Sequence, residues 1–397
     1  MRRDEIKQLL ESEGPRRVLA TIHNLLEGET LENGAKIKME PWQFSIREIW
    51  EGTVGPVEET LPNNSGDMLF REAINTTMFN AITRMLISST VIGAYDKQPT
   101  IGDNLVTTVK SSRRVENIAG FTEAEGLKDV LEGAPYEDSS IGEKYVTTEA
   151  GKKGRIVSIT EEMIMEDNTG QVVYRAQRIG EQAAVDKEIA IMSAVLDKNS
   201  NVYRPSGTPT AIYSTANGNY AGTAGAYTGF DSAIPLTDWL TIDKLEQFHS
   251  LSIIDDRQMG TAQPILWNPQ IMLVPPGMKA TALRIINATE VRVTTSAPGS
   301  TAAENRTMFR NPAQGLFTVY SSPLMLRIGV SDASTHYHYG DFKKQFIYRD
   351  IWPIQTFSQG RDSDEAFERD VVSRFKVRYL GGVAALDYRW VIKIKAA

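Results

Sequence analysis

One stretch decides the fold, residues 152–196: KKGRIVSITEEMIMEDNTGQVVYRAQRIGEQAAVDKEIAIMSAVL. It predicts a strand over 152–159 and a short helix that ends at Met165, opened by a capping box at Ser158-Ile159-Thr160-Glu161. A long helix follows over about 168–197, because apolar residues recur every three or four positions and no proline interrupts them. Such a helix spans roughly 45 Å, which is unusually long for a globular domain and suits an elongated molecule.

A long polar excursion, residues 123–149, precedes that stretch and is rich in Glu, Asp, Gly and Ser. A strand predicted at 105–109 precedes this excursion, and the strand predicted at 152–159 follows it. These features predict an extended hairpin, because its acidic tip has too few apolar groups to fold back on its own domain. We expect the hairpin to lie across a second copy of the chain; the alternative is a solvated loop. The expected contact residues are Glu123, Glu125, Glu132, Glu137 and Asp138 at the tip, and Lys152, Lys153 and Arg155 at the base.

The first hundred residues predict helices and an arm. Residues 4–26 predict two short amphipathic helices separated by Gly14-Pro15, since proline can begin a helix but cannot continue one. Residues 27–66 are polar with scattered turns and predict an extended arm. Residues 67–90 carry apolar side chains at spacings of four, which predicts a core-facing helix.

The second half of the chain predicts a mixed domain followed by a strand-rich end. Gly381-Gly382 suggests a hairpin turn between the last two strands. Ile392 and Ile394 alternate with lysines, as in a strand with one buried face. The expected elements are strands at 265–267, 271–274, 317–320, 324–328, 346–348, 371–380 and 383–395, a helix at 278–286 and a polar excursion at 290–312.

Composition narrows the function classes. The chain has 397 residues, a net charge of −7 and a pI near 5.4, whereas a dedicated nucleic-acid binder normally carries a basic stripe. It has no cysteine, which excludes disulfides, thiolate nucleophiles and cysteine-ligated zinc. Its start lacks the apolar core of a signal peptide, and no run approaches the roughly 18 apolar residues of a membrane span. We therefore expect a soluble protein made in the cytosol.

Motifs that carry chemistry are missing. There is no Gly-x-Ser-x-Gly elbow, P-loop or dinucleotide glycine motif, and neighbouring acids such as Asp255-Asp256 and Glu161-Glu162 do not share a face. Aromatic residues are not interleaved with basic ones along the sequence, as they are in single-strand binders. His336-Tyr337-His338 puts two imidazoles on the same side of a strand, which suits a metal site or a polar strand face. Without a second such motif we favour the strand face, and we expect no catalytic, cofactor or metal site.

The order of these features resembles the major capsid proteins of tailed bacteriophages, with their Hong Kong 97-like fold. Residues 113–159 look like that family's extended loop (the E-loop), and residues 159–167 look like the short segment before its spine helix. Residues 171–196 look like the spine helix itself. Gly340-Asp341-Phe342 and the segment 367–372 resemble the family's return strands.

The resemblance covers about residues 100–397 and implies an α+β fold in five segments. These segments are an N-terminal arm with helices at 1–100, the E-loop hairpin at 101–160, the spine helix of the peripheral domain at 161–200, an axial domain at 201–340, and return strands of the two domains at 341–397.

The resemblance also implies a function without catalysis: a major capsid protein that self-assembles, as hexamers and pentamers, into an icosahedral shell around double-stranded DNA. The implied partners are further copies of the chain, packaged DNA held by non-specific contact, a portal, and scaffolding or cement proteins, with no membrane. The implied location is the virion, after assembly in the host cytoplasm. Two alternatives stay open: an encapsulin-like nanocompartment that encloses an enzyme cargo, and an unrecognised hydrolase or glycan-binding protein.

Overall fold

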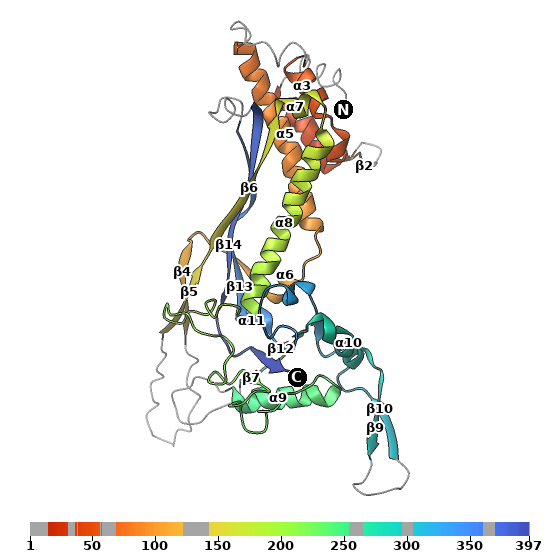
Figure 1. The fold of residues 1–397 in the computed structure, drawn as a ribbon, viewed down its shortest axis with the longest axis vertical. Helices are drawn as coiled ribbons and strands as arrows, with labels where there is room; N and C mark the ends of the chain where they lie inside the picture. The colour runs from red at the N-terminus through yellow and green to blue at the C-terminus, as the bar shows by residue number, and fades with distance from the viewer. Residues whose placement is uncertain are drawn as a thin grey trace, which may run out of the picture. The chain divides into compact units, whose positions relative to one another are not determined.

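The structure is a computed structural model with helices and strands in both of its compact units. It describes residues 15–30, 36–37, 39–55, 57, 69–121, 143–253, 265–295, 305–359 and 370–396. Unit 1 comprises residues 1–100, 151–187 and 352–381, and unit 2 comprises residues 101–150, 188–351 and 382–397. The mixture of helices and sheets (Figure 1) confirms the predicted α+β class.

Among the described residues, five helices belong wholly or mainly to unit 1. They are α2 (Pro15–Glu27), α3 (Ile46–Thr53), α5 (Leu69–Lys97), α7 (Glu161–Met165) and α8 (Thr169–Val195), whose last turns belong to unit 2. The N-terminal segment adds the short pieces β1 (Glu29–Thr30), β2 (Lys36–Ile37) and η1 (Pro41–Gln43).

The corner between α7 and α8 is tied to the start of α3. Ser45 caps α3 by accepting the amide hydrogen of Glu48, and its hydroxyl donates to the Asp167 carboxylate at 2.9 Å. The Thr169 hydroxyl accepts the amide hydrogen of Ile46 at 2.8 Å. The N-terminal segment is thereby fixed to the helix that follows it by more than a hundred residues.

A four-stranded sheet runs in the order β3-β13-β14-β6. Its strands are β3 (Thr107–Lys110), β13 (Phe346–Gln359), β14 (Val371–Ala385) and β6 (Gly151–Thr160). β14 pairs with β6 in antiparallel fashion, with Lys376 opposite Ile156 and Arg378 opposite Gly154. β6, residues 352–359 of β13 and residues 371–381 of β14 belong to unit 1.

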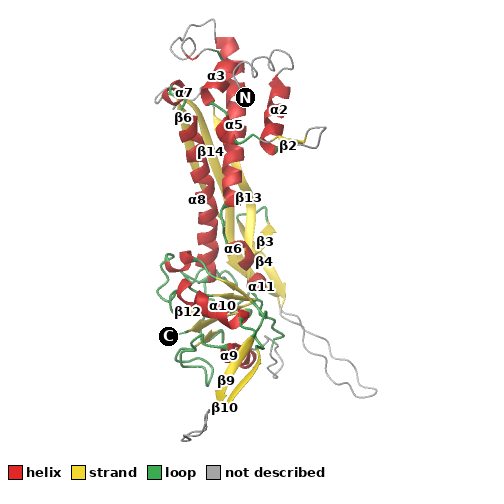
Figure 2. Ribbon diagram, turned by 90° about the vertical axis from the view of Figure 1, so that its right-hand side faces the viewer, coloured by secondary structure: helices red, strands yellow, loops and turns green. Residues whose placement is uncertain are grey.

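The core of unit 1 lies between this sheet and the two long helices. Val157, Phe375 and Val377 point from the strands into a cluster that includes Leu86 of α5 and Ala176 of α8. Figure 2 shows α5 and α8 running alongside β6 and β14. The side chains that alternate with these buried ones must point to the other face of the sheet.

Unit 2 is built on a five-stranded sheet of mixed direction in the order β11-β8-β12-β15-β7. Its core includes Tyr337 and Tyr339 of β12 and Ile392 and Ile394 of β15, packed against helices α9 and α10. The elements are β7 (Tyr220–Ala221), β8 (Ile271–Leu273), β11 (Thr318–Tyr320), β12 (His336–Gly340), β15 (Val391–Lys395), α6 (Gly102–Leu105), α9 (Trp239–Ser252), α10 (Lys279–Asn287), α11 (Phe342–Gln345), η2 (Pro276–Met278) and η3 (Pro323–Leu326).

The described part of unit 2 also contains two antiparallel hairpins. The first consists of β4 (Val115–Phe121) and β5 (Glu143–Glu149), and the second consists of β9 (Glu290–Thr295) and β10 (Asn305–Arg310). The second hairpin occupies the polar excursion predicted at 290–312.

Several sequence predictions are confirmed. The long helix predicted over 168–197 is α8, and the helix predicted at 67–90 is α5, which continues to Lys97. The second amphipathic helix begins at Pro15, while its predicted partner lies outside the described residues. β6, α7, α10 and β8 also lie where they were expected, and β15 shows the predicted alternation of buried and half-buried side chains.

Other predictions are wrong. The hairpin strands are β4 and β5, not the segments at 105–109 and 152–159, because β3 pairs with β13 and β6 pairs with β14. β14 continues straight through Gly381-Gly382, where no turn forms. A Cβ at Gly382 would lie against the backbone of Glu149 and Ala150, so a close approach and not a turn requires glycine there.

Four smaller predictions also fail. Residues 265–267 form no strand, and 324–328 begin as a 3₁₀ helix because Pro323 and the capping residue Ser322 start one. Residues 27–66 contain α3 and are not a simple extended arm. The N-cap of α7 is Thr160, whose side chain makes no capping hydrogen bond, so the proposed capping box is absent. Helix α9 had no counterpart among the predicted elements.

The close approach of α5 and α8 gives the first testable prediction. A Cβ at Gly180 on α8 would lie against the carbonyl oxygen of Val91 and the Cβ of Ala94. Gly180→Ala should therefore push the helices apart and lower the free energy of unfolding by about 1–3 kcal/mol. Gly93→Ala on α5 is the matched control, because a Cβ there meets nothing within 4 Å. The control should be neutral or stabilising in denaturant unfolding; an equal loss in both variants would contradict the packing argument.

Candidate assembly interface

The hairpin β4–β5 is one of the two antiparallel hairpins that the structure describes in unit 2. Its strands pair from Val115 opposite Glu149 to Phe121 opposite Glu143. The side chains of Val115 and Tyr145 are exposed on it, although both are apolar or aromatic. The acidic tip residues expected to contact a second copy, Glu123, Glu125, Glu132, Glu137 and Asp138, lie outside the described residues.

A single buried guanidinium group fixes the base of this hairpin. The side chain of Arg349, on β13, is 1% exposed. Its Nη1 donates to the carbonyl oxygen and the hydroxyl of Thr148 on β5, at 3.1 and 2.5 Å. Its Nη2 donates to the Ser111 hydroxyl at 2.8 Å, to the Arg113 carbonyl oxygen, and to the Glu116 carboxylate at 2.9 Å. One side chain thus holds both strands of the hairpin where they leave the rest of unit 2.

The electrostatics of the anchor favour a charged Glu116. A hydrogen bond from Ser111 is the largest effect and lowers the pKa of the Glu116 carboxyl; burial opposes it, and the positive charges of Arg349 and Arg113 lower the pKa further. The carboxylate is 39% exposed, so water solvates its free side. The planar fork of arginine suits this cluster, because it can donate in several directions at once while its charge is compensated.

The three basic residues predicted at the base of the hairpin lie elsewhere. Lys152, Lys153 and Arg155 are all on β6, a strand of the four-stranded sheet in unit 1. The prediction that these residues lie at the base of the hairpin is therefore wrong. The hairpin strand β5 ends at Glu149, and the next strand begins at Gly151, where it pairs with β14. Whether they contact a neighbouring copy stays a prediction.

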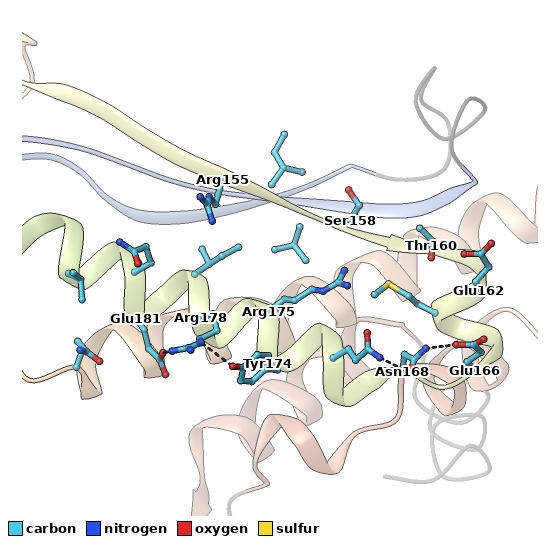
Figure 3. A pocket seen from close by; sticks show the side chains of 18 residues that line it. Arg155, Ser158, Thr160, Glu162, Glu166, Asn168, Tyr174, Arg175, Arg178 and Glu181 are labelled. Carbon is cyan, nitrogen blue, oxygen red and sulfur yellow. Dashed lines mark hydrogen bonds and ion pairs between the residues drawn. The ribbon is translucent and has the colours of Figure 1, made fainter.

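Arg155 lines an open groove of unit 1 between β6, α7 and α8 (Figure 3). The groove has a volume of about 1250 Å³. Charges of both signs line it, and several are already paired: Arg178 donates to Glu181 at 3.1 Å and to the Tyr174 hydroxyl at 3.1 Å. These contacts raise the pKa of the Arg178 guanidinium. Polar side chains such as Ser158, Thr160 and Gln171 complete its lining.

The histidine pair on β12 is part of the core of unit 2. His336 Nε2 lies 2.8 Å from the Tyr220 hydroxyl, and its Nδ1 lies 2.9 Å from the Thr335 hydroxyl. His338 is 1% exposed, and within the described part of the chain neither ring nitrogen has a hydrogen-bond partner. No group of three or more His, Asp or Glu side chains with the arrangement of a metal site occurs among the described residues. The histidines thus neighbour hydroxyl groups and aromatic rings rather than further metal ligands.

None of the helices in the described part of the chain combines the length and apolar character needed to cross a bilayer.

Comparison with known protein families shows which family this chain belongs to. A family model described as "Phage capsid protein" matches residues 144–394. The chain belongs to the phage capsid protein family. The match runs from β5 to β15 and so includes the spine-like helix α8 and both main sheets. A phage capsid protein is a structural component of the virion shell.

Three solved structures illustrate what this phage capsid protein is similar to. One is from Mycobacterium phage Cain, with 15% identity, 75% of this chain and 90% of that chain covered, and a TM-score of 0.44. Another is the capsid of an empty GTA particle, with 12% identity, 74% and 88% coverage, and a TM-score of 0.43. A third is a virus-like particle from Pyrococcus furiosus, with 10% identity, 77% and 96% coverage, and a TM-score of 0.40. A search of the curated proteins found no match.

The Arg349 anchor gives the second testable prediction. Arg349→Leu would leave the Thr148 and Arg113 carbonyl oxygens without their charged donor, so the free energy of unfolding should fall by about 2 kcal/mol or more. Arg349→Lys should recover only part of this, because an ammonium group cannot donate to both strands as the guanidinium fork does.

Hydrogen exchange is the decisive measurement for the anchor. Amides of β4 and β5 should exchange faster in Arg349→Leu, while those of β9 and β10 should be unchanged. Arg327→Leu, on an exposed arginine elsewhere in unit 2, is the matched control and should change neither hairpin. Unchanged protection of β4 and β5 in Arg349→Leu would show that the anchor does not hold the hairpin.

The buried histidines give the third prediction, a loss of stability on acidification. Burial lowers the pKa of His249 to about 4, and burial together with the charge of Lys393 holds the pKa of His338 well below its ordinary value. Because the unfolded chain titrates near pH 6.5, it binds protons below that pH that the folded state does not bind. The free energy of unfolding should fall by up to about 1.4 kcal/mol per pH unit for each imidazole, from pH 6.5 downwards.

Denaturation at pH 7.5 and pH 5 tests this sign. His338→Phe keeps a ring of similar size beside Tyr213, whose ring centroid lies 5.1 Å away, and removes one titrating group. It should therefore flatten the pH dependence. His23→Phe, at an exposed position on α2, is the control: the free energy of unfolding should change with pH as much as it does in the original chain. A steeper slope in His338→Phe would contradict the assignment.

Proposed function

We propose that this chain is the major capsid protein of a tailed phage, which assembles as hexamers and pentamers into a closed icosahedral shell around double-stranded DNA. The single observation that carries the proposal is the family match over residues 144–394. The element order supports it, since an arm, an extended hairpin, a long helix, a second sheet and return strands follow one another as the resemblance implies.

The surfaces of the chain support a partner that is another copy. A two-stranded hairpin without its own core is marginal in water unless it packs on something, and β4–β5 exposes Val115 and Tyr145. Tyr174 and Met165 are also more than half exposed on α8 and α7. We propose that the acidic hairpin tip, with Glu123, Glu125, Glu132, Glu137 and Asp138, lies across a neighbouring copy and that opposite charges set its register.

The remaining parts of the proposal concern organisation and partners. Residues 1–100 act as the arm, 101–160 as the E-loop region, 161–200 as the spine, 201–340 as the axial domain, and 341–397 as the return strands. Packaged DNA contacts the shell without sequence preference, because the net charge of −7 leaves room only for local basic surfaces. A portal completes the shell, scaffolding or cement proteins assist it, and assembly takes place in the host cytoplasm.

The fourth prediction is that the purified chain forms closed shells. Many copies that meet through heterologous contacts can close by symmetry. Size-exclusion chromatography followed by electron microscopy of the leading peak should show uniform closed particles built from the 44.1 kDa chain. A monomer at every salt and protein concentration would overturn the proposal. Particles from an infected host should contain DNA, whereas an encapsulin-like compartment would contain an enzyme.

A further inference from the structure

Strand β6 lies at the edge of the unit 1 sheet, because the strand order is β3-β13-β14-β6. In the part of the chain that the structure describes, β6 has a hydrogen-bonded neighbour on one side only, the strand β14. A strand bonded on one side directs the N–H and C=O groups of every second residue to its free edge. The 10 residues of β6 therefore offer a row of backbone donors and acceptors to a further strand.

The sequence of β6 protects only half of this edge. Residues 151–155 are glycine, lysine and arginine, and charged side chains commonly keep an edge strand from pairing. Residues 156–160, Ile-Val-Ser-Ile-Thr, contain no charge and no proline, and all but the serine are β-branched. Ile156 is 51% exposed. The second half of β6 thus has the composition of a strand that pairs on both of its edges.

The open groove between β6, α7 and α8 follows this edge (Figure 3). Its lining includes the consecutive residues 155–158 of β6. Successive side chains of a strand point to opposite faces of the sheet, so a groove lined by consecutive residues follows the edge of the strand rather than one face. Tyr174 of α8 also lines the groove and is 56% exposed. The free edge of β6 is therefore accessible to a further strand.

Charge changes sign from one end of β6 to the other. Lys152, Lys153 and Arg155 lie in its first half, and Glu162 follows its end, in the first turn of α7. Figure 3 shows Arg155 and Glu162 at separate places along the groove. Among the residues that the structure describes, no carboxylate pairs with these three cations and no cation pairs with the Glu162 carboxylate. A complementary strand must therefore be acidic beside the start of β6 and basic beside its end.

β6 itself has that charge order when it runs in the opposite direction. With Val157 opposite Val157 of a second copy, Lys152 of each copy lies beside Glu162 of the other. In the same register Ile156 lies opposite Ser158, and the uncharged residues meet in the middle. Val157 of both copies stays on the core side, because directly opposite residues share a face. We infer that β6 pairs in antiparallel fashion with β6 of a second copy and joins the two unit 1 sheets into one.

This contact goes beyond the proposed function, because it adds a contact of a different symmetry. Contacts around a hexamer or pentamer are heterologous, whereas an antiparallel pair of identical strands is isologous and has a two-fold axis. Strand pairing supplies main-chain hydrogen bonds, and the opposite charges at the two ends select the register. In a shell the pairing joins copies of two different rings, and it forms between two free copies as well.

Crosslinking of one residue to itself tests the two-fold contact. The chain has no cysteine, so Ile156→Cys introduces a single thiol beside the inferred axis. Diagonal neighbours across an antiparallel pair lie roughly 7–8 Å apart, within reach of a short bifunctional thiol reagent. We expect mass spectrometry to identify a 156–156 junction between copies. Ile92→Cys, at an exposed position of α5, is the matched control and should give only a small fraction of this product.

Charge reversal in the Ile156→Cys chain tests the register. Lys152→Glu brings like charges together twice in each pair of copies, so the yield of the 156–156 junction should fall by about fivefold or more. Glu162→Lys alone should lower the yield to a similar degree, and the two reversals together should restore most of it. Arg84→Glu, at an exposed position of α5, is the control and should leave the yield unchanged.

Hydrogen exchange with single-residue resolution reports on the backbone of β6. In free copies the amides of every second residue over 153–159 should exchange rapidly, because only the others bond to β14. Pairing should protect the rapidly exchanging set as well, while the amides of α5 exchange as before. Protection of these amides without a 156–156 junction would mean that another segment occupies the edge, and this result would overturn the inference.

The outcomes separate this inference from the proposed function. Shells that form normally but give no 156–156 junction would overturn the inference and leave the proposed function intact. A 156–156 junction in a chain that forms no shells would support the inference and overturn the proposed function. If the two charge reversals together failed to restore the junction, the antiparallel register, and with it the inference, would be wrong.

Discussion

The burial of Phe375 and Val377 beneath α5 and α8 is the constraint on which the functional surfaces of unit 1 depend. A strand alternates its side chains between two faces, so a register that buries these two residues must expose Lys376 and Arg378. A slip of one residue would bury two charges and expose two large apolar groups, at a cost that no local contact could offset. Because β14 pairs with β6, the same register also sets which side chains of β6 are buried: Val157 is buried and Ile156 is exposed.

Unit 2 solves a different problem at the base of its hairpin. Strands β4 and β5 form a two-stranded hairpin on which Val115 and Tyr145 stay exposed, so burial alone does not fix where the strands leave the domain. Arg349 replaces a hydrophobic anchor with a polar one: it is fully buried and donates to main-chain and side-chain acceptors of both strands. A buried charge is costly unless it is compensated, and the partly exposed Glu116 supplies that compensation without being buried itself. The direction of the hairpin is thus specified by hydrogen-bond geometry rather than by packing.

Much of the fold follows from the sequence because its long elements carry periodic signals. The stripes of α8 and α5 extend over many turns, and Ile392 and Ile394 alternate with lysines over a whole strand. The errors arise where a tertiary contact overrides a local signal. Gly381-Gly382 has the composition of a turn, yet Gly382 is required by the backbone of Glu149, which lies more than two hundred positions earlier. Likewise, the hairpin strands were misassigned because pairing partners of β3 and β6 lie near the far end of the chain.

The candidate site was harder to foresee for the same reason. Along the sequence, aromatic and basic residues are not interleaved, and that observation argues against a single-strand nucleic-acid binder. The alignment of β6, β13 and β14 brings Lys152 and Trp352 together from positions two hundred residues apart. Arg349 gives no sequence signal either, since an arginine in a strand next to Tyr348 and Asp350 looks like an ordinary surface residue. Pairing, not composition, creates both features.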